Sequence, residues 1–396
     1  MPEPAKRSPM TETDLSLATT LATWLAKAAT GPELIAYRGG LTPRELDAPD
    51  GETAALVSGA AVHDLGWLRR VAVRGEDRFR WLSGMVTNTV NDLGENAGTW
   101  NLVLNAQGRI QGDLYVWREG DSLTLTIAAD QYDRLLAHLE RFIIMDDVEL
   151  APLSVDANGE LSEDSVLGLA GPLAAGVLAR LGMPAPAEPL TSARAAWNGE
   201  KVRVVRGYGA LAAHYEIWAR ATKIPALWQA LTEAGAVPVG AATLEAFRIA
   251  EGIPAYGIDI AERDLPQETS QMRALSFNKG CYLGQEIVER IRSRGSVHRH
   301  LRPLELSGPV PAAGTELRMG DGAVAGEITS AAELPLRTGA RVFALGMIRG
   351  EAEHSPQRQR PVAGDPEQGH QPLSYTAGTA TGTAHILAAP PVLKAE

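Results

Sequence analysis

The chain has 396 residues, which is enough for two or three domains with a substantial core. Its formal net charge of -11 argues against non-specific nucleic-acid binding, because that binding depends on neutralising phosphates. No apolar run approaches the roughly 20 residues that cross a bilayer. The single cysteine excludes an intramolecular disulfide framework and fits a reducing compartment. Together these features favour a cytoplasmic protein.

Residues 1–34 are predicted to form an N-terminal extension. Acidic residues interrupt this segment, and it lacks the uninterrupted apolar core of a signal peptide. A short helix with one apolar side is one expectation, and a poorly packed extension is the equal alternative. The apolar side would consist of Leu15, Leu21, Trp24 and Leu25.

Residues 35–150 are predicted to form the first part of a core of mixed α and β structure. A strand is expected from Leu68 to Val73, and a helix is expected to begin after Gly75-Glu76-Asp77. Asp130 is expected to cap a helix with an apolar stripe at 135, 136, 139, 142 and 143. Three further strands are expected at 102–104, 114–117 and 123–127, with a hairpin turn at 119–121.

Residues 151–300 are predicted to form the second part of the core. Strands are expected at 202–205 and 215–218, and helices at 224–234 and 242–251. From 301 to 350, short apolar segments broken by glycine and proline predict a small C-terminal β-barrel. Residues 351–396 are rich in proline, glycine, glutamine and threonine, and they are predicted to be a disordered tail.

The most informative segment is the octapeptide Lys279–Glu286, which contains the only cysteine, Cys281. Lys279 lies two residues before the sulfur, where a cation can lower the pKa of a thiol. The order of glycines and lysine excludes a Walker phosphate loop. One thiol without a nearby partner cannot hold zinc or an iron–sulfur cluster, so no metal site is expected. The alternative is that Cys281 is a small buried hydrophobic residue.

The stretch 276–286 resembles the motif of the YgfZ family, which comprises folate-binding relatives of the glycine-cleavage T-protein. Weaker matches at 248–257, 265–268 and 322–330 extend the resemblance over roughly residues 35–350. It implies an α+β fold in which a T-protein-like folate-binding core of mixed sheets and helices precedes a small β-barrel. It also implies tetrahydrofolate or a one-carbon derivative as cofactor. The implied role is assembly or repair of iron–sulfur enzymes, including enzymes that modify tRNA.

Glu216 is the first candidate for ligand recognition, because the segment 206–217 resembles the T-protein strand whose glutamate binds the pterin ring. A pterin offers a ring N–H beside an exocyclic amine, and one ionised carboxylate can accept both hydrogen bonds. Those donors would keep a partly buried carboxylate charged. The alternative is a solvent-facing residue on a strand.

The same resemblance implies cofactor-binding roles for Arg248, Tyr256 and Tyr208. Arg248 can pair with a glutamate carboxylate of folate, and Tyr256 can stack on a ring. Either residue can instead be an ordinary surface or packing residue. Tyr208 lies one residue farther from Glu216 than is usual in T-proteins.

A basic segment runs from Arg290 to Arg302 and contains no acidic residue. One use is to attract the polyglutamate tail of cellular folates or a carboxylate-rich partner surface, and another is a contact with tRNA phosphates. The alternative is a surface whose cations pair with nearby acids such as Glu286 and Glu289, with little energetic effect.

One departure from the T-protein pattern lies at 107–114. T-proteins that transfer aminomethyl groups typically have two consecutive aspartates here, and this chain has Gly112 followed by Asp113. Losing a carboxylate from a reacting centre commonly costs ~2–4 kcal/mol of barrier stabilisation. The pattern therefore counts against aminomethyl transfer and leaves Asp113 as a cofactor-binding candidate.

Three functions follow from these observations. The favoured one is a folate-binding accessory protein whose partners are iron–sulfur enzymes or assembly proteins and in which Cys281 and Lys279 are the reactive residues. The second is a folate-dependent aminomethyltransferase of T-protein type or another one-carbon transferase. The third is a relative that has lost folate and binds only partners. Neither membrane association nor direct nucleic-acid binding is expected.

Overall fold

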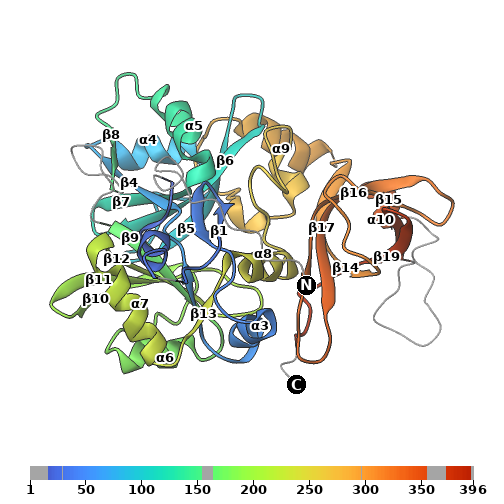
Figure 1. The fold of residues 1–396 in the computed structure, drawn as a ribbon. Helices are drawn as coiled ribbons and strands as arrows, with labels where there is room; N and C mark the ends of the chain where they lie inside the picture. Colours follow the sequence, from blue (N-terminus) through green and yellow to red (C-terminus); the bar gives the residue numbers. More distant parts are fainter. Residues whose placement is uncertain (1–16, 29, 154–163, 296, 355–371, 394–396) are drawn as a thin grey trace.

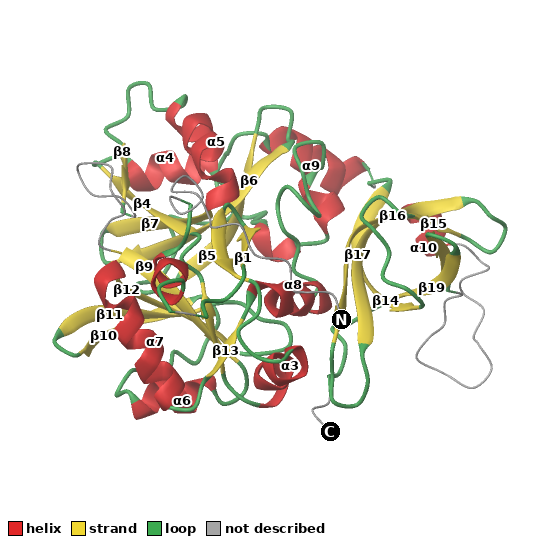
Figure 2. Ribbon diagram, in the orientation of Figure 1, coloured by secondary structure: helices red, strands yellow, loops and turns green. Residues whose placement is uncertain are grey.

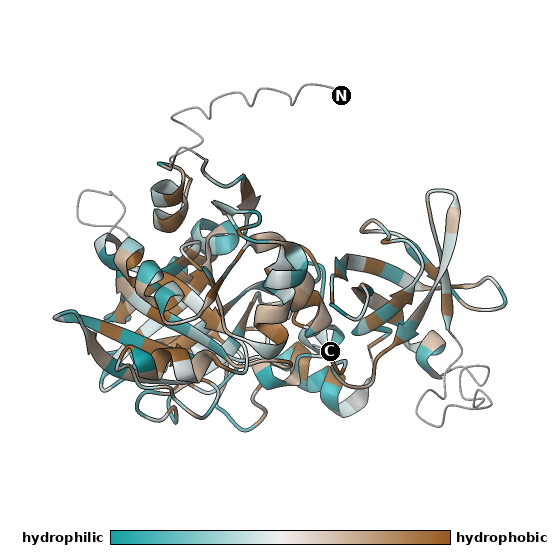
Figure 3. Ribbon diagram, turned by 60° about the horizontal axis from the view of Figure 1, so that its bottom comes forward, coloured by the Kyte–Doolittle hydropathy of each residue, from teal (hydrophilic) through white to brown (hydrophobic). Residues whose placement is uncertain are grey.

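The structure is a computed structural model that describes residues 17–28, 30–153, 164–295, 297–354 and 372–393. Two β-sheets face each other in the core, helices cover their outer sides, and a separate barrel lies beside the core (Figures 1 and 2). Apolar residues gather on the strands and on the inner sides of the helices (Figure 3). The predicted fold class, an α+β core followed by a small β-barrel, is confirmed.

The first sheet has the strand order β5-β6-β7-β4-β8. Helices α4 and α5 pack on its outer side, where the apolar stripe of α5 is buried against β4, β6 and β7. The predicted strands and both helices of this region are confirmed, but Asp130 lies in the first turn of α5 and does not cap it. The elements are β4 (Leu68–Arg74), α4 (Arg78–Met85), β5 (Gly98–Leu104), β6 (Ile110–Glu119), β7 (Ser122–Ala128), α5 (Ala129–Glu140) and β8 (Glu149–Pro152).

The second sheet has the order β10-β11-β12-β9-β3-β13, with α6 and α7 on its outer side. Its strand β3 comes from the first part of the chain, so a boundary at residue 150 does not separate the two halves of the core. The elements are β3 (Ala61–Asp64), β9 (Asp164–Ala170), α6 (Ala174–Arg180), β10 (Thr191–Trp197), β11 (Glu200–Arg206), β12 (His214–Arg220), the short turn η1 (Ala221–Lys223), α7 (Ile224–Glu233) and β13 (Val237–Val239).

The N-terminal helix expected as one alternative is present as α2 (Thr20–Leu25), and Thr19 caps it by accepting a hydrogen bond from the backbone N–H of Ala22. Its residue Leu21 is buried against the second sheet and α7, whereas Leu15 lies outside the described residues. A two-stranded sheet of β1 (Leu34–Tyr37) and β2 (Gly40–Pro43), followed by α3 (Pro49–Ser58), leads into the core.

Helix α8 lies between the core and the barrel (Figure 1) and contacts barrel strands β16 and β17. The closed barrel has the order β14-β17-β16-β15-β18-β19. The elements from the end of the core onward are α8 (Ala241–Ala250), η2 (Pro266–Thr269), η3 (Met272–Ala274), α9 (Gln285–Arg294), β14 (Arg299–Ser307), β15 (Glu316–Arg318), β16 (Val324–Leu334), β17 (Arg341–Arg349), α10 (Gly350–His354), β18 (Leu373–Ala377) and β19 (Ala380–Ile386).

The prediction of a disordered tail over 351–396 is wrong for the strands that close the barrel. Leu373, Tyr375 and Ala384 are buried inside it, while the polar residues that alternate with them face outward. Two short strands supply few apolar residues, so the average composition of the segment conceals their period-2 pattern. Residues 355–371 lie outside the described residues.

Gly168 lies at the centre of the second sheet, where a neighbouring side chain approaches its backbone closely. It pairs with His63 on one side and with Glu216 on the other, so the three residues form one cross-strand row. A Cβ atom at Gly168 would lie 1.9 Å from Cε1 of the buried His63 ring. Burial also lowers the pKa of His63 to about 3, so this ring is neutral.

Gly168→Ala is expected to lower the free energy of unfolding by about 2–3 kcal/mol, because the buried ring has no free space into which to move. Gly176→Ala is the matched control. A Cβ atom at Gly176, in α6, meets nothing within 4 Å. This change is expected to stabilise by about 0.5–1 kcal/mol. Urea unfolding of both variants measures the difference, and equal stabilities would contradict the expected clash.

Candidate ligand site at the sheet interface

Four aromatic side chains form a continuous cluster between the two sheets. Trp100 on β5 stacks near Tyr115 on β6 with a centroid distance of 6.3 Å, and Tyr115 stacks near Trp117 at 6.1 Å. Trp117 meets Trp218 of β12 edge to face at 5.9 Å. We call Trp100, Tyr115, Trp117 and Trp218 the aromatic cluster. Trp100, Trp117 and Trp218 are buried and Tyr115 is half-buried, so Tyr115 is the ring of this cluster whose surface is partly accessible to a flat ligand.

Glu216 lies at the end of the aromatic cluster on β12, half-buried. Its Oε2 accepts a hydrogen bond of 2.7 Å from the indole N–H of Trp218, which fixes the orientation of the carboxylate. Within the described part of the chain, its Oε1 has no hydrogen-bond donor. Burial raises the pKa of Glu216, although the Trp218 hydrogen bond and the nearby Arg70 act in the opposite direction.

Asp113 lies on the same side of β6 as Tyr115 and Trp117. Its Oδ2 accepts a hydrogen bond of 2.8 Å from Trp100 Nε1, and its Oδ1 accepts one of 2.9 Å from Gln131 Nε2. Burial raises the pKa of Tyr115 to about 12, and the charges of Arg273, Asp113 and Glu216 also act on that pKa. Residues from β5, β6, α5, β12 and η3 therefore converge on this site.

The structure corrects the interpretation of Gly112. A Cβ atom at this position would lie 2.7 Å from Gln131 Oε1 and 3.0 Å from a methyl group of Leu135, both on α5. Position 112 thus faces the helix on the outer side of the sheet, and position 113 faces the aromatic cluster. The carboxylate on the cluster side is therefore present as Asp113, so Gly112 gives no reason to exclude aminomethyl transfer.

Tyr208 and Arg273 close one end of the aromatic cluster. The Arg273 guanidinium carbon lies 3.6 Å from the ring centroid of Tyr208 and 4.5 Å from that of Trp100. Tyr208, which follows β11, is 36% exposed, so one side of its ring is accessible. Through Arg273, Tyr208 lies near Trp100 of the aromatic cluster, and its role as a cofactor contact stays a prediction.

Tyr256 and Arg248 have other contacts. Tyr256 is buried, its hydroxyl donates to Ile110 O at 3.4 Å, and the guanidinium of Arg134 lies 4.9 Å from its ring centroid. Arg248 binds both carboxylate oxygens of Glu245, and it also binds Asp259 Oδ2 at 2.7 Å and the carbonyl of Ile253. Asp259 in turn accepts hydrogen bonds from two barrel residues, Thr329 and Ser330. These contacts place Arg248 in the connection between core and barrel, not at the aromatic cluster.

Lys279 anchors the octapeptide to the C-terminal end of α4. Its Nζ donates to the carbonyl oxygens of Ser83, Val86 and Asn88 at 2.7, 2.6 and 2.8 Å. Three acceptors match the three protons of the ammonium group, so none is left for the exposed Cys281. Burial lowers the pKa of Lys279 to about 8. The proposed activation of the thiol by Lys279 gains no support from this geometry.

Lys279→Met is expected to lower the free energy of unfolding by about 2–4 kcal/mol, because three inward-facing carbonyls lose a charged donor. Lys201→Met is the control, because Lys201 is exposed at the start of β11 and is expected to change stability by less than about 0.5 kcal/mol. Thermal unfolding of both variants measures the effect. A Lys279→Met protein as stable as the wild type would show that the carbonyls are adequately satisfied by water.

Three arginines of the basic segment form ion pairs, which agrees in part with its alternative interpretation, but of the two acids expected there only Glu289 takes part in the pairs that the structure describes. Arg299 pairs with Asp264 and Glu268, and Arg302 pairs with Glu353. Arg292 pairs with Glu289 on the same helix. The side chain of Arg294 lies outside the described residues.

The sequence did not single out the aromatic cluster or Arg273. Trp100, Tyr115, Trp117 and Trp218 occur in strands and alternate with core residues, so each alone is indistinguishable from packing. The detectable signal is that three successive positions on one side of β6 carry a carboxylate and two aromatic rings, namely Asp113, Tyr115 and Trp117. Among the described residues, no group of three or more His, Cys, Asp or Glu side chains is arranged to hold a metal. In the same part of the chain, no helix combines the length and apolarity needed to cross a membrane.

Two facing sheets, a carboxylate-bearing aromatic cluster between them and an appended barrel define the class of T-protein-like folds. The GCVT N-terminal domain family matches residues 36–279, which is more than half of the chain. The chain belongs to this family, and it is a relative of the YgfZ and T-protein branches.

Individual relatives agree with this assignment. The chain is 28% identical to an aminomethyltransferase of Rubrobacter xylanophilus over 84% of this chain and 89% of the relative. It is 28% identical to the tRNA-modifying protein YgfZ of Cronobacter sakazakii over 63% of this chain and 73% of that relative. The fold matches the crystal structure of the glycine cleavage system aminomethyltransferase T from Bartonella henselae with a TM-score of 0.79. That match has 20% identity and covers 94% of this chain and 97% of the other.

Proposed function

We propose that this chain binds a tetrahydrofolate between its two sheets and acts as a cytoplasmic accessory protein for iron–sulfur enzymes, including enzymes that modify tRNA. The observation that best supports folate as the ligand is the carboxylate of Glu216. One of its oxygens is held by Trp218, and the other has no donor in the described part of the chain. A pterin ring N–H and its exocyclic amine supply two parallel donors that suit this carboxylate.

The surrounding residues suit the other chemical features of a reduced folate. Tyr115, the half-buried ring of the aromatic cluster, provides a packing surface for the pterin. Asp113, held by Trp100 and Gln131, presents a carboxylate on the same side, where it can orient or accept a proton from a ligand nitrogen. A bound tetrahydrofolate would supply nitrogens that carry one-carbon units.

The accessory role is supported by the octapeptide and by the resemblance to a tRNA-modifying protein. Lys279 fixes this segment to α4, while Cys281 is exposed, so the thiol is presented on the surface of the protein. A surface thiol is suited to contact with a second macromolecule. In this proposal Cys281 acts toward a partner and Glu216 holds the folate.

The test is a deletion strain in which several iron–sulfur enzyme activities and the iron–sulfur-dependent modification of tRNA are measured. Wild type is expected to restore them, whereas Glu216→Gln and Cys281→Ala are each expected to fail. Restoration by both variants would contradict the proposal.

A second candidate, aminomethyl transfer, is favoured by the position of Asp113 and by the aminomethyltransferase relatives. Formation of methylene-tetrahydrofolate from an aminomethylated lipoyl carrier protein, lost in Asp113→Asn, would favour this candidate over the accessory role.

A further inference from the structure

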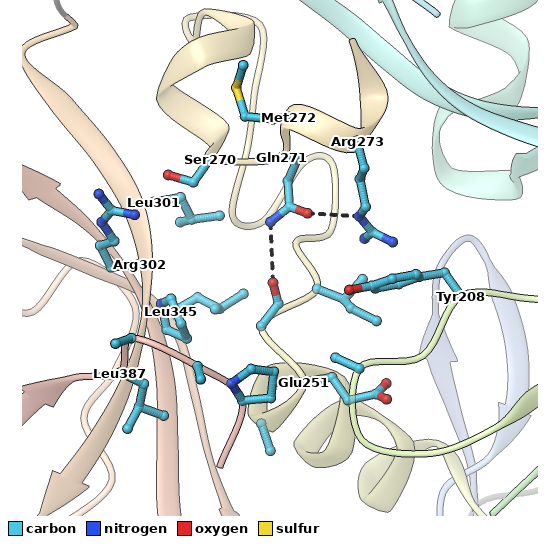
Figure 4. A pocket seen from close by; sticks show the side chains of 18 residues that line it. Tyr208, Glu251, Ser270, Gln271, Met272, Arg273, Leu301, Arg302, Leu345 and Leu387 are labelled. Carbon is cyan, nitrogen blue, oxygen red and sulfur yellow. Dashed lines mark hydrogen bonds between the residues drawn. The ribbon is translucent and has the colours of Figure 1, made fainter. Parts of the chain in front are cut away.

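A cavity of about 400 Å³ lies between the core and the barrel (Figure 4). The loop 270–273 forms one side, and the end of α8 with Glu251 forms another. The barrel contributes Leu301 of β14 and Leu345 of β17, and the segment that follows β19 contributes Leu387. The lining is therefore mixed, because both the core and the barrel contribute apolar and charged side chains.

Arg273 and Tyr208 connect this cavity to the aromatic cluster. Both residues line the cavity, and Figure 4 shows Arg273 beside Tyr208. The guanidinium carbon of Arg273 lies 3.6 Å from the ring centroid of Tyr208 and 4.5 Å from that of Trp100. Its Nε donates to Gln271 Oε1 at 3.2 Å. Within the described residues, its two terminal nitrogens have no hydrogen-bond acceptor. A planar cation with free donors thus lies where the cavity meets the ligand site.

The other arginines considered for an anion are already occupied. Arg248 is bound by Glu245 and Asp259, and Arg302, on the opposite side of the cavity, is bound by Glu353 through two hydrogen bonds. Pairing with carboxylates largely cancels the charge that either residue could offer to a ligand. Arg273 lacks such a partner within the described residues and is half-buried beside two rings, so its full charge is available to an anion.

We propose that this cavity receives the aryl-glutamate tail of the bound folate and that Arg273, not Arg248, binds its carboxylate. The inference rests on the proposed folate site and extends it from the pterin to the tail. Tyr208 and Trp100 hold the guanidinium flat, so its terminal N–H groups are arranged for two parallel hydrogen bonds to one carboxylate. The apolar residues Leu301 and Leu345 then border the aryl portion of the tail.

The test compares two ligands in tryptophan-fluorescence titrations: tetrahydrofolate, and 6-methyltetrahydropterin, which has the ring but no tail. Arg273→Met is expected to weaken tetrahydrofolate binding about 10- to 30-fold, as loss of a charge-assisted pair does. Binding of 6-methyltetrahydropterin is expected to change less than about twofold. Lys201→Met, at an exposed position on β11 that is not part of the cavity lining, is the control, and tetrahydrofolate binding is expected to be unchanged.

Other results would overturn the inference in recognisable ways. If Arg273→Met binds tetrahydrofolate as tightly as the wild type, Arg273 does not bind the carboxylate of the tail. If the affinities for both ligands fall equally, Arg273 belongs to the pterin site. If wild type binds neither ligand, the proposed function itself fails. Thermal unfolding reports whether Arg273→Met is folded. If Arg273→Met does not fold, Arg273→Lys replaces it, because lysine keeps the charge but loses the planar fork. Arg273→Lys is expected to weaken the binding of tetrahydrofolate but not that of 6-methyltetrahydropterin. Unchanged tetrahydrofolate binding by Arg273→Lys would overturn the inference.

Discussion

Glu216→Gln is expected to weaken tetrahydrofolate binding by at least about 100-fold, because hydrogen bonds to a charged group contribute about 1.5–3 kcal/mol each and two are altered. An amide keeps one acceptor but turns an N–H₂ donor toward one of the pterin donors. The fold should persist, since the amide oxygen can still accept from Trp218 Nε1. Quenching of the clustered tryptophans on titration with tetrahydrofolate measures the affinity.

The same carboxylate predicts how binding depends on pH. Burial raises the pKa of Glu216, so it is protonated at a higher pH than an ordinary glutamate. Only the ionised form accepts two hydrogen bonds, and tetrahydrofolate affinity should therefore fall as the pH decreases through this raised pKa. Glu216→Gln should remove that part of the pH dependence. Glu149→Gln, at an exposed position on β8, is the control and should alter neither affinity nor pH profile. Tight binding by Glu216→Gln would show that the ligand lies elsewhere.

Periodicity in the sequence predicted most of the core but not the closure of the barrel. The strands and helices between 68 and 251 have long apolar stripes that keep one period, so local pattern and tertiary burial agree. Strands β18 and β19 depend on pairing with β14 and β15, which are distant along the chain. Such pairing is not encoded in local composition, and a segment rich in glycine and threonine therefore read as disordered.

The residues of the candidate site also divide into those that a local motif predicts and those whose neighbours are known only from the fold. Glu216 was predictable because a motif fixed its place on a strand, and Tyr208 followed from the same segment. Arg248 was assigned to an anion because the sequence does not show that Glu245 and Asp259 meet its guanidinium. Arg273 was missed because its environment is made by Trp100 and Tyr208, two residues more than 60 positions away from it. Charge partners across sheets and loops are visible only once the chain is folded.

Gly112→Asp, which restores the first aspartate of the aminomethyl-transferring pattern, is expected to destabilise the protein by about 2–4 kcal/mol and to create no transfer activity. The new Cβ atom would lie 2.7 Å from Gln131 Oε1 and 3.0 Å from Leu135, under α5 and away from the aromatic cluster. The added carboxylate would face the oxygen of Gln131, which now accepts from the backbone N–H of Asp113 at 3.0 Å. Moving that amide would also remove one of the two hydrogen bonds that hold the Asp113 side chain and leave the one from Trp100.

Gly112→Ala separates the steric part of this effect from the charge. It introduces the same Cβ contacts without a carboxylate and is expected to cost about 1–2 kcal/mol, so the remaining loss in Gly112→Asp belongs to burial of the charged group. Urea unfolding gives both values, and methylene-tetrahydrofolate formation from an aminomethylated carrier protein gives the activity. A stable Gly112→Asp protein that gains this activity would mean that position 112 reaches the ligand. Because the sheet sends residues 112 and 113 to opposite sides, we expect any proton transfer to a folate nitrogen to depend on Asp113 alone.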